Sequence, residues 1–267
     1  AGTVKALDAA DLEMLDAPII LNNTYHLHLR PGEDKIMRLG GVHSFMNWNR
    51  PVLTDSGGFQ VLSLGAQKNL RDGKNNNTNP SVKITDDGVE FRSHINGSKH
   101  FFSPEVSITI QKKLGADIVM AFDECTPDNA DAAYTSAAMG RTHAWGKKSL
   151  EEFMRPACGA GVGKTPKQFF HPWRQFIFGI IQGGLNKKMR IESAKFITGL
   201  KTDGVGFDGI AIGGESIGYN MKLTETILDW VLPLISEEKP RYTMGVGASP
   251  LDLLRVINKG IDMFDCV

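Results

Sequence analysis

The 267-residue chain has few cysteines, no net charge and no long apolar run. Its three cysteines, Cys125, Cys158 and Cys266, have no CxxC spacing, so the chain alone builds neither a disulfide framework nor a complete zinc site. Thirty basic residues balance thirty acidic ones, which excludes a generally basic nucleic-acid binder and restricts any RNA contact to a local surface. Without an 18-residue apolar run or a signal-peptide pattern, we expect no membrane association and a cytoplasmic location.

Short apolar runs alternate with stretches of helical period, which is typical of βα units around a parallel sheet. The run Ile118–Phe122 is apolar without alternation, as expected for a strand covered on both faces. Seven strands are predicted: PIILNN from Pro18, PVLTDS from Pro51, ADIVMAFDE from Ala116, QFIFGIIQGG from Gln175, GIAIGG from Gly209, RYTMGVG from Arg241 and MFDCV from Met263.

Two intervening helices carry clear start and stop signals. Ser103-Pro104 begins one that Gly115 ends, and Ser249-Pro250 begins another that Gly260 ends. Residues 130–154 and 221–235 predict two more helices. Around residues 68–102 an Asn-rich loop and a β-hairpin with DDG and NG turns form an insertion.

These elements predict one domain over residues 1–267, an α/β protein with a TIM-type (β/α)8 barrel. An open doubly wound sheet is disfavoured because no strand-GxGxxG-helix unit is present. Only seven of eight strands are found, so we expect a chain that lacks its first strand and is trimmed at both ends.

The carboxyl ends of barrel strands carry the catalytic groups of such folds. Acids, an amide and a glycine pair at these ends suit a flat, polar heterocycle, because carboxylates accept from ring N–H groups and glycines expose the backbone. Phe59 and Met244 supply apolar faces for the ring. The strand-end residues are Asp55, Asp123, Gln182, Gly213, Gly214, Met244 and Asp265.

Several of these segments resemble the tRNA-guanine transglycosylases, or queuine tRNA-ribosyltransferases, and FDECTP resembles the bacterial-type catalytic subunit. The likeness runs in order over essentially the whole chain. The matching segments are NNTYHLHLRPG from Asn22, TDSGGFQVLSL from Thr54, DIVMAFDECTP from Asp117, GIIQGG from Gly179, AIGGES from Ala211, YTMGVG from Tyr242 and DMFDCV from Asp262.

The resemblance implies a zinc-containing TIM barrel that exchanges the wobble guanine of tRNA anticodons for a 7-deazaguanine, preQ1 or a queuine-type base. It implies that Asp265 is the nucleophile and Asp55 the general acid/base. The base-binding residues would be Asp55, Ser56, Gly57, Gly58, Phe59, Asp123, Cys125, Gln182, Gly213, Gly214 and Met244. The RNA-binding residues would be Gly245, Val246, Gly247, Ala248, Ser249 and Pro250. We expect Asp55 and Asp265 to meet across a single cavity.

The chain departs from the bacterial pattern after its glycine pair. Glu215 follows the pair directly, and Tyr219 stands where relatives carry an acid, so the preferred deazaguanine stays open. The CxCxxC and distant His that bind zinc in the family are absent from this chain, so no residue is assigned to the metal. A homodimer is expected only by resemblance.

Two binding patterns compete with this interpretation. His26-Leu27-His28 is an HxH motif of the kind found in metal-dependent amidohydrolases, but the central strands end in Gln182 and glycine rather than in further histidines. Residues 159–165 approach a P-loop, yet Cys158 replaces its first glycine and the segment follows a predicted helix.

Two further alternatives concern the paired acids. A non-catalytic subunit of the same family is expected to lack one acid, whereas Asp55 and Asp265 are both present. A retaining glycoside hydrolase also uses two strand-end carboxylates, but the acid, amide and glycine set suits a purine better than a sugar chain.

Overall fold

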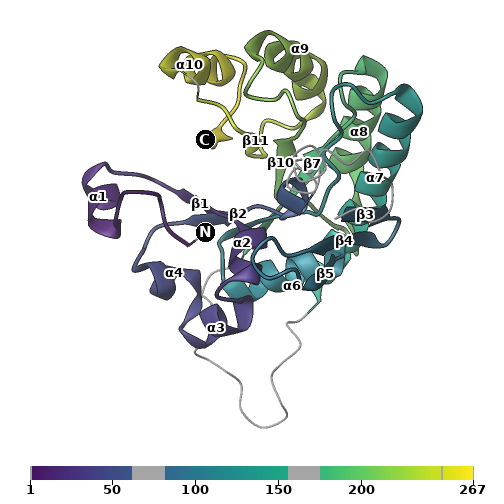
Figure 1. Ribbon diagram of the computed structural model, residues 1–267. Helices are drawn as coiled ribbons and strands as arrows, with labels where there is room; N and C mark the ends of the chain where they lie inside the picture. The colour runs from purple at the N-terminus through teal and green to yellow at the C-terminus, as the bar shows by residue number, and fades with distance from the viewer. Residues whose placement is uncertain (1, 62–81, 156–174, 248, 267) are drawn as a thin grey trace, which may run out of the picture. The chain divides into compact units, whose positions relative to one another are not determined.

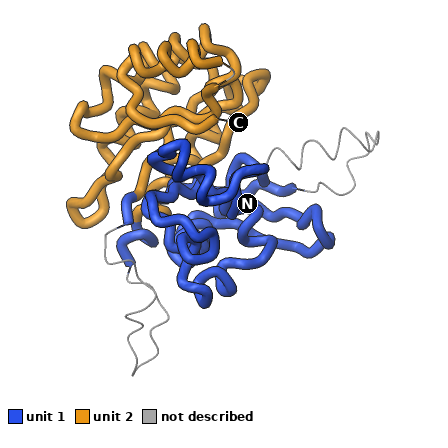
Figure 2. The backbone as a smooth tube through the Cα atoms, turned by 90° about the vertical axis from the view of Figure 1, so that its left-hand side faces the viewer, with its two compact units in different colours: residues 1–122, 151–176 blue, residues 123–150, 177–267 orange. Residues whose placement is uncertain are grey.

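The computed structural model describes residues 2–61, 82–155, 175–247 and 249–266 (Figure 1). The chain forms two compact units (Figure 2). Unit 1 comprises Ala1–Phe122 and Glu151–Phe176, and unit 2 comprises Asp123–Leu150 and Ile177–Val267. Each unit contains parallel strands and helices of its own.

The parallel strands of unit 1 follow the order β1-β2-β6. Their register aligns Asn22 with Thr54 and Thr54 with Val119, so the residues after β1 and β2 are neighbours at the carboxyl edge. The strands are β1 (Ile20–Asn22), β2 (Val52–Thr54) and β6 (Ile118–Met120), and the helices are α1 (Ala9–Met14), α2 (Thr24–Leu29), α3 (Glu33–Arg38), α4 (Gly41–Met46) and α6 (Pro104–Leu114).

An antiparallel sheet of three strands lies in the predicted insertion. It consists of β3 (Val82–Thr85), β4 (Gly88–Arg92) and β5 (Lys99–Phe102) in that order. Gly88 has a φ of +150°, and a Cβ there would lie 2.2 Å from the carbonyl oxygen of Phe102, so only glycine fits. The expected hairpin is confirmed, with a third strand added; residues 68–81 lie outside the described residues.

The parallel strands of unit 2 follow the order β7-β10-β11-β12. One row of paired residues crosses their ends, from Ile181 through Ile212 and Thr243 to Phe264. The strands are β7 (Phe176–Ile181), whose first residue belongs to unit 1, β10 (Gly209–Ile212), β11 (Arg241–Thr243) and β12 (Met263–Phe264). A two-stranded ribbon joins β8 (Lys201–Thr202) to β9 (Val205–Gly206).

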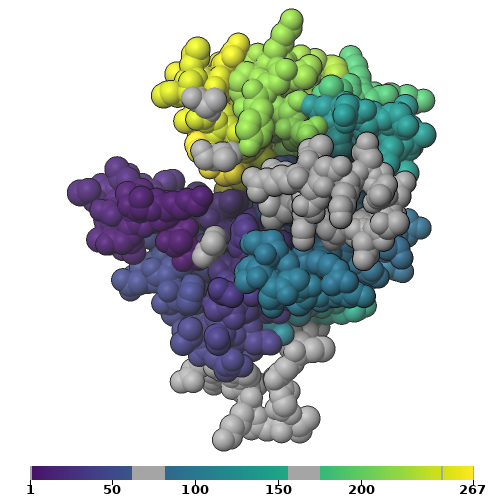
Figure 3. Space-filling model, viewed as in Figure 1, coloured from purple at the N-terminus to yellow at the C-terminus, as the bar shows by residue number. Residues whose placement is uncertain are grey.

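The helices of unit 2 follow its strands in alternation. They are α7 (Ala132–Met154), whose last residues belong to unit 1, α8 (Lys187–Gly199), α9 (Met221–Val231), the 3-10 turn η1 (Leu232–Leu234) and α10 (Pro250–Asn258). In Figure 3 the yellow α10 lies at the surface, where Leu251 and Leu254 are exposed.

The predicted helix signals act as expected. The Ser103 side chain accepts from the N–H of Val106, Pro104 occupies the first turn of α6, and Gly115 ends the helix in the left-handed conformation. Ser249 and Asp252 form a capping box at α10. All seven predicted strands and four predicted helices are present, and the alternation of parallel strands with helices is the TIM-type (β/α) fold class.

Candidate active site

The predicted site residues of unit 2 follow the ends of its strands. Gln182, Gly213, Met244 and Asp265 each come directly after one residue of the paired row that crosses β7, β10, β11 and β12. Parallel strands in register bring such residues to one edge of a sheet. The backbone alone therefore groups an amide, a glycine, a thioether and a carboxylate within unit 2.

Gln182 and Asp123 form a buried pair. The Nε2 atom of Gln182 donates to Oδ2 of Asp123 at 2.7 Å, and the Gln182 backbone N–H donates to Oγ of Ser193 on α8 at 3.2 Å. The Oε1 atom of Gln182 is buried and has no hydrogen-bond partner among the described residues. A buried acceptor without a donor is unfavourable, so an N–H group brought to this atom would be stabilising.

A buried arginine that the sequence did not predict as a site residue bonds to the backbone on either side of Gln182. Arg190, in the first turns of α8, is 1% exposed, and burial lowers its pKa to about 10, so it stays charged at neutral pH. Its guanidinium donates to the carbonyl oxygens of Gly184, Ile181 and Gly213. No pattern in the helix separates it from its exposed basic neighbours Lys187 and Lys188.

The Gly213-Gly214 pair is tightly packed. A Cβ on Gly213 would lie 2.4 Å from Nε2 of Gln182, and one on Gly214 would lie 2.6 Å from Nη2 of Arg190. Gly214 also has a φ of +147°, which side-chain-bearing residues rarely adopt. Both glycines are therefore required for the backbone to approach Gln182 and Arg190.

Cys125 is held as a neutral thiol. Burial and the negative charge of Asp123 raise the pKa of the thiol to about 12. The thiolate is the form that attacks carbon or binds metal, so Cys125 at neutral pH contributes packing and a weak polar group, not a nucleophile.

Asp265 is oriented through one of its two oxygens. The Tyr242 hydroxyl donates to Oδ1 at 2.6 Å, and the backbone N–H of Gly245 donates to the same atom at 3.0 Å. No donor from the described residues reaches Oδ2. The carboxylate is thus fixed by β11 and the residues after it, while Oδ2 keeps its lone pairs for an incoming atom.

The segment after β11 is shaped by glycines. A Cβ on Gly218 would lie 2.3 Å from the carbonyl oxygen of Gly245, and one on Gly247 would lie 2.7 Å from Sγ of Cys266. Val246 is fully buried, whereas Gly247 and Pro250 are exposed. Among the residues predicted to contact RNA, Ala248 lies outside the described residues.

Asp55 lies in unit 1, directly after β2. The backbone N–H of Thr24 donates to its Oδ1 at 2.8 Å, and the side-chain amide of Asn23 donates to its Oδ2. Asn23 follows β1, whose pairing with β2 makes it the neighbour of Asp55. Donors on both oxygens stabilise the ionised carboxylate.

The residues directly after Asp55 form a tight turn. Ser56 is buried, its hydroxyl accepts from the N–H of Gly58, and its carbonyl accepts from Ser107. Gly57 has a φ of +79°, and a Cβ there would lie 2.8 Å from the Phe102 ring. Phe59 is about half exposed.

Glu215, the residue that departs from the bacterial pattern, contacts a second acid. Its Oε2 accepts from the backbone N–H of Asp128 at 2.7 Å, and Ser216 donates to the Asp128 carboxylate. Burial and the charge of Glu215 raise the pKa of Asp128. Tyr219, at the position of the family acid, is largely exposed.

The histidines of the HxH motif bond within the protein. Nδ1 of His28 contacts Glu33 at 2.8 Å, and Nε2 contacts His100 at 3.0 Å. In the described ranges, no group of three or more His, Cys, Asp or Glu side chains could hold a metal ion. The residues described thus offer no fit for zinc. The P-loop-like stretch and Cys158 lie outside the described residues.

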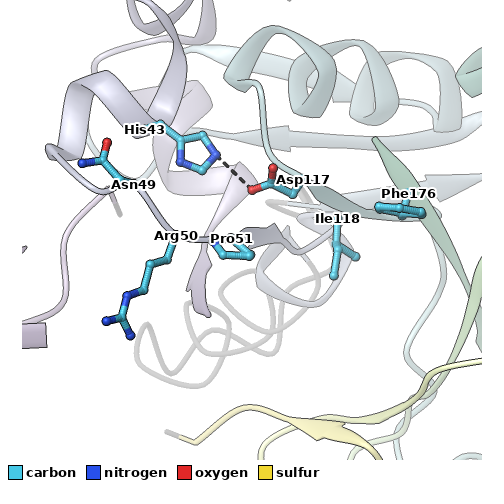
Figure 4. A pocket seen from close by; sticks show the side chains of 7 residues that line it. All are labelled: His43, Asn49, Arg50, Pro51, Asp117, Ile118 and Phe176. Atoms are coloured by element: carbon cyan, nitrogen blue, oxygen red, sulfur yellow. Dashed lines mark hydrogen bonds and ion pairs between the residues drawn. The ribbon is translucent and has the colours of Figure 1, made fainter. Parts of the chain in front are cut away.

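A cavity of about 320 Å³ lies elsewhere in unit 1, at the amino ends of β2 and β6 (Figure 4). His43 and Asp117 point toward each other at its wall, with Nε2 and Oδ2 3.0 Å apart. TIM-type active sites lie at the opposite, carboxyl ends of the strands. None of the predicted site residues lines it. The lining residues are His43, Asn49, Arg50, Pro51, Asp117, Ile118 and Phe176.

The alternation of parallel strands and helices defines a TIM-type protein, and acids, an amide and close-packed glycines follow the carboxyl ends of its strands. A family model described as Queuine tRNA-ribosyltransferase matches residues 1–267. The chain is 46% identical over 265 residues to the Queuine tRNA-ribosyltransferase of Natranaerobius thermophilus, covering 99% of this chain and 62% of that protein. It is 47% identical over 265 residues to that of Herpetosiphon aurantiacus, covering 99% and 58%.

The chain therefore belongs to the queuine tRNA-ribosyltransferase family, which confirms the resemblance stated from its motifs. It spans about three fifths of the length of the curated relatives that it matches. Within the part of the chain that the structure describes, no helix has the length and apolar character needed to cross a membrane.

Proposed function

We propose that the protein exchanges the wobble guanine of tRNA anticodons for a 7-deazaguanine through a covalent ribosyl-Asp265 intermediate. Membership of the family, whose relatives are named queuine tRNA-ribosyltransferases, supports the reaction class. The single observation that carries the base chemistry is the Asp123–Gln182 pair, with its unpartnered buried Oε1 atom.

Base recognition follows from this pair. The Asp123 carboxylate and Gln182 Oε1 are acceptors for the N1–H and amino groups of guanine, and the backbone of Gly214 meets the remaining polar edge. Phe59 and Met244 cover the two faces of the ring. A stacked base cannot reach such a site, so the target nucleotide flips out of the anticodon loop.

Cleavage of the glycosidic bond builds positive charge on the ribose. Asp265 Oδ2 attacks C1′, the bond from C1′ to guanine N9 breaks, and the sugar becomes an ester of Asp265. Asp55 enters this step as the protonated acid, gives its proton to the departing guanine and is left as a carboxylate. The tRNA stays attached to the protein while the bases change.

The second half of the reaction reverses these steps with a new base. Asp55, now a carboxylate held by Asn23 and Thr24, removes the N9 proton of the incoming deazaguanine. The base nitrogen attacks C1′, and the ester bond to Asp265 breaks. Asp265 returns as a carboxylate, stabilised by the donors on Oδ1.

The partners and the cofactor are inferred from the family to which the chain belongs. We propose tRNA and a guanine-type base as substrates, a cytoplasmic location, a homodimer, and zinc bound outside the residues described here. Among the described residues, no group of side chains is able to hold the metal.

Incorporation of labelled guanine tests this function. The full-length protein, incubated with tRNA and radiolabelled guanine, should place label in the tRNA, and Asp55→Asn should abolish incorporation. Asp16→Asn, which changes an exposed acid paired with Arg50, serves as the control and should leave incorporation unchanged. Release of guanine from tRNA without incorporation would instead indicate a hydrolase and would refute the proposal.

A further inference from the structure

Arg190 connects helix α8 to the loops after two strands. Its Nε donates to the Gly184 carbonyl at 2.7 Å, and its Nη1 donates to those of Ile181 at 3.1 Å and Gly213 at 2.6 Å. Three hydrogen bonds of the guanidinium thus go to backbone carbonyls. Two of these carbonyls lie at the end of β7 or just after it, and the third follows β10. One side chain therefore sets the distance between the two strand ends.

Those three carbonyls surround the residues proposed to read the base. Ile181 and Gly184 flank Gln182 along the chain, and Gly213 precedes Gly214. Nη2 of Arg190 fills the space that a Cβ on Gly214 would need, at 2.6 Å. Movement of this guanidinium would therefore shift the Gln182 amide and the Gly214 backbone together.

The planar guanidinium is suited to this task, and lysine is not. Its N–H groups lie in a rigid fork, so several carbonyls are held in one plane at fixed angles, whereas an ammonium group donates from a single point on a flexible stem. Burying a charge is unfavourable unless its donors are satisfied, and here neutral carbonyls satisfy them.

We propose that Arg190 is a positioning residue for base recognition, which holds Gln182 and Gly214 at the spacing that the guanine edge requires. This inference rests on the proposed function. Arg190 acts through Gln182 and Gly214 and touches no reacting atom. Its loss should weaken binding of the base much more than it slows the chemical steps.

The test compares guanine KM and kcat for the full-length protein and its Arg190→Lys variant in the labelled-guanine assay. Arg190→Lys should raise the KM for guanine by about tenfold and leave kcat at saturating guanine within about twofold, because geometry is lost while the acids stay in place. If Arg190→Lys does not fold, Arg190→Gln replaces it, since its amide still donates hydrogen bonds without a buried charge.

Two control variants on the same helix separate positioning from stability and charge. Ile197→Ala removes buried side-chain atoms of α8, and should lower the unfolding midpoint in urea without changing the guanine KM. Lys188→Met removes an exposed cation of α8 and should also leave the guanine KM unchanged. In a Gln182→Ala background, Arg190→Lys should raise the KM by clearly less than tenfold, because the residue it positions is gone.

An unchanged guanine KM in a folded Arg190 variant would overturn the inference, as would an equal rise in Ile197→Ala of matched stability. Either result leaves the proposed function intact, because the parent protein still incorporates guanine. Failure of the parent protein to incorporate guanine would instead refute the proposed function itself.

Discussion

Gln182 and Asp123 share a hydrogen bond of 2.7 Å while both side chains are buried. The Gln182 amide donates to the Asp123 carboxylate, and Oε1 of the amide remains without a donor from the described residues. One hydrogen bond therefore fixes the two side chains relative to each other, while an acceptor of the amide is left unused.

Asp123→Asn should weaken guanine more than it weakens the fold. The neutral amide loses the charge-assisted bonds to ring N–H groups, so the guanine KM should rise roughly 10- to 100-fold, while the free energy of unfolding changes by about 1 kcal/mol or less. Enzyme kinetics and urea unfolding measure the two effects. Asp229→Asn, an exposed acid on α9, is the control, and equal guanine affinity in Asp123→Asn and the parent would remove the recognition role.

Tyr242→Phe should slow the reaction without loosening the fold. It removes the O–H donor to Oδ1 of Asp265, so the carboxylate loses orientation and stabilisation as a leaving group, and kcat should fall about tenfold. Tyr134→Phe makes the same atomic change beside Glu124, an acid outside the proposed chemistry, and should leave kcat unchanged. Equal kcat for Tyr242→Phe and the parent would contradict the orienting role.

Arg141→Met should destabilise unit 2. Glu124 is fully buried and accepts from Nε and Nη2 of Arg141, so removing the guanidinium leaves a buried charge with the Tyr134 hydroxyl and the fold loses about 3–5 kcal/mol. Tyr134→Phe removes one bond to the same carboxylate and should lose only about 1 kcal/mol. Urea unfolding measures both, and similar small losses would show that the Arg141 bond contributes little.

His43 should make stability depend on pH. Burial opposes a charge on its ring, but two acceptors outweigh it and raise the pKa of His43. They are the Asp117 carboxylate at Nε2 (Figure 4) and the Trp48 carbonyl at Nδ1. A raised pKa in the folded state gives stability that is complete below the unfolded pKa of about 6.5 and is lost as the pH rises through the folded value.

Urea unfolding between pH 5 and 9 measures this contribution. Stability of the parent should fall on the alkaline side relative to His43→Gln, whose side chain does not titrate. Asp117→Asn should remove most of the difference, because the raised pKa depends on that carboxylate. Parallel pH profiles for the parent and His43→Gln would contradict the prediction.

The positions of the candidate site residues at strand ends could be predicted from the sequence, because buried strands appear in it as apolar runs. Asp55 and Asp265 each follow such a run directly, and pairing of neighbouring strands is enough to place Asn23 beside Asp55. The capping serine Ser103 was likewise readable, because its side chain satisfies backbone N–H groups at a helix start.

The burial of Arg190 and the positions of the short helices could not be predicted in this way. A basic residue on a helix is normally solvated, so nothing local distinguishes buried Arg190 from exposed Lys188. Helices α2, α3 and α4 have six residues each, too few to show a helical period. Leu254 has core-like spacing on α10 yet is 62% exposed, because periodicity does not say what covers a face.

The covalent intermediate is the most direct test of the account. The full-length protein, mixed with tRNA and a guanine analogue and run on a denaturing gel, should give a band of protein joined to tRNA, and Asp265→Asn should give none. Asp262→Asn, three residues earlier and exposed, controls for loss of charge and should keep the band. A band of equal intensity with Asp265→Asn would show that another group attacks the ribose and would contradict the account.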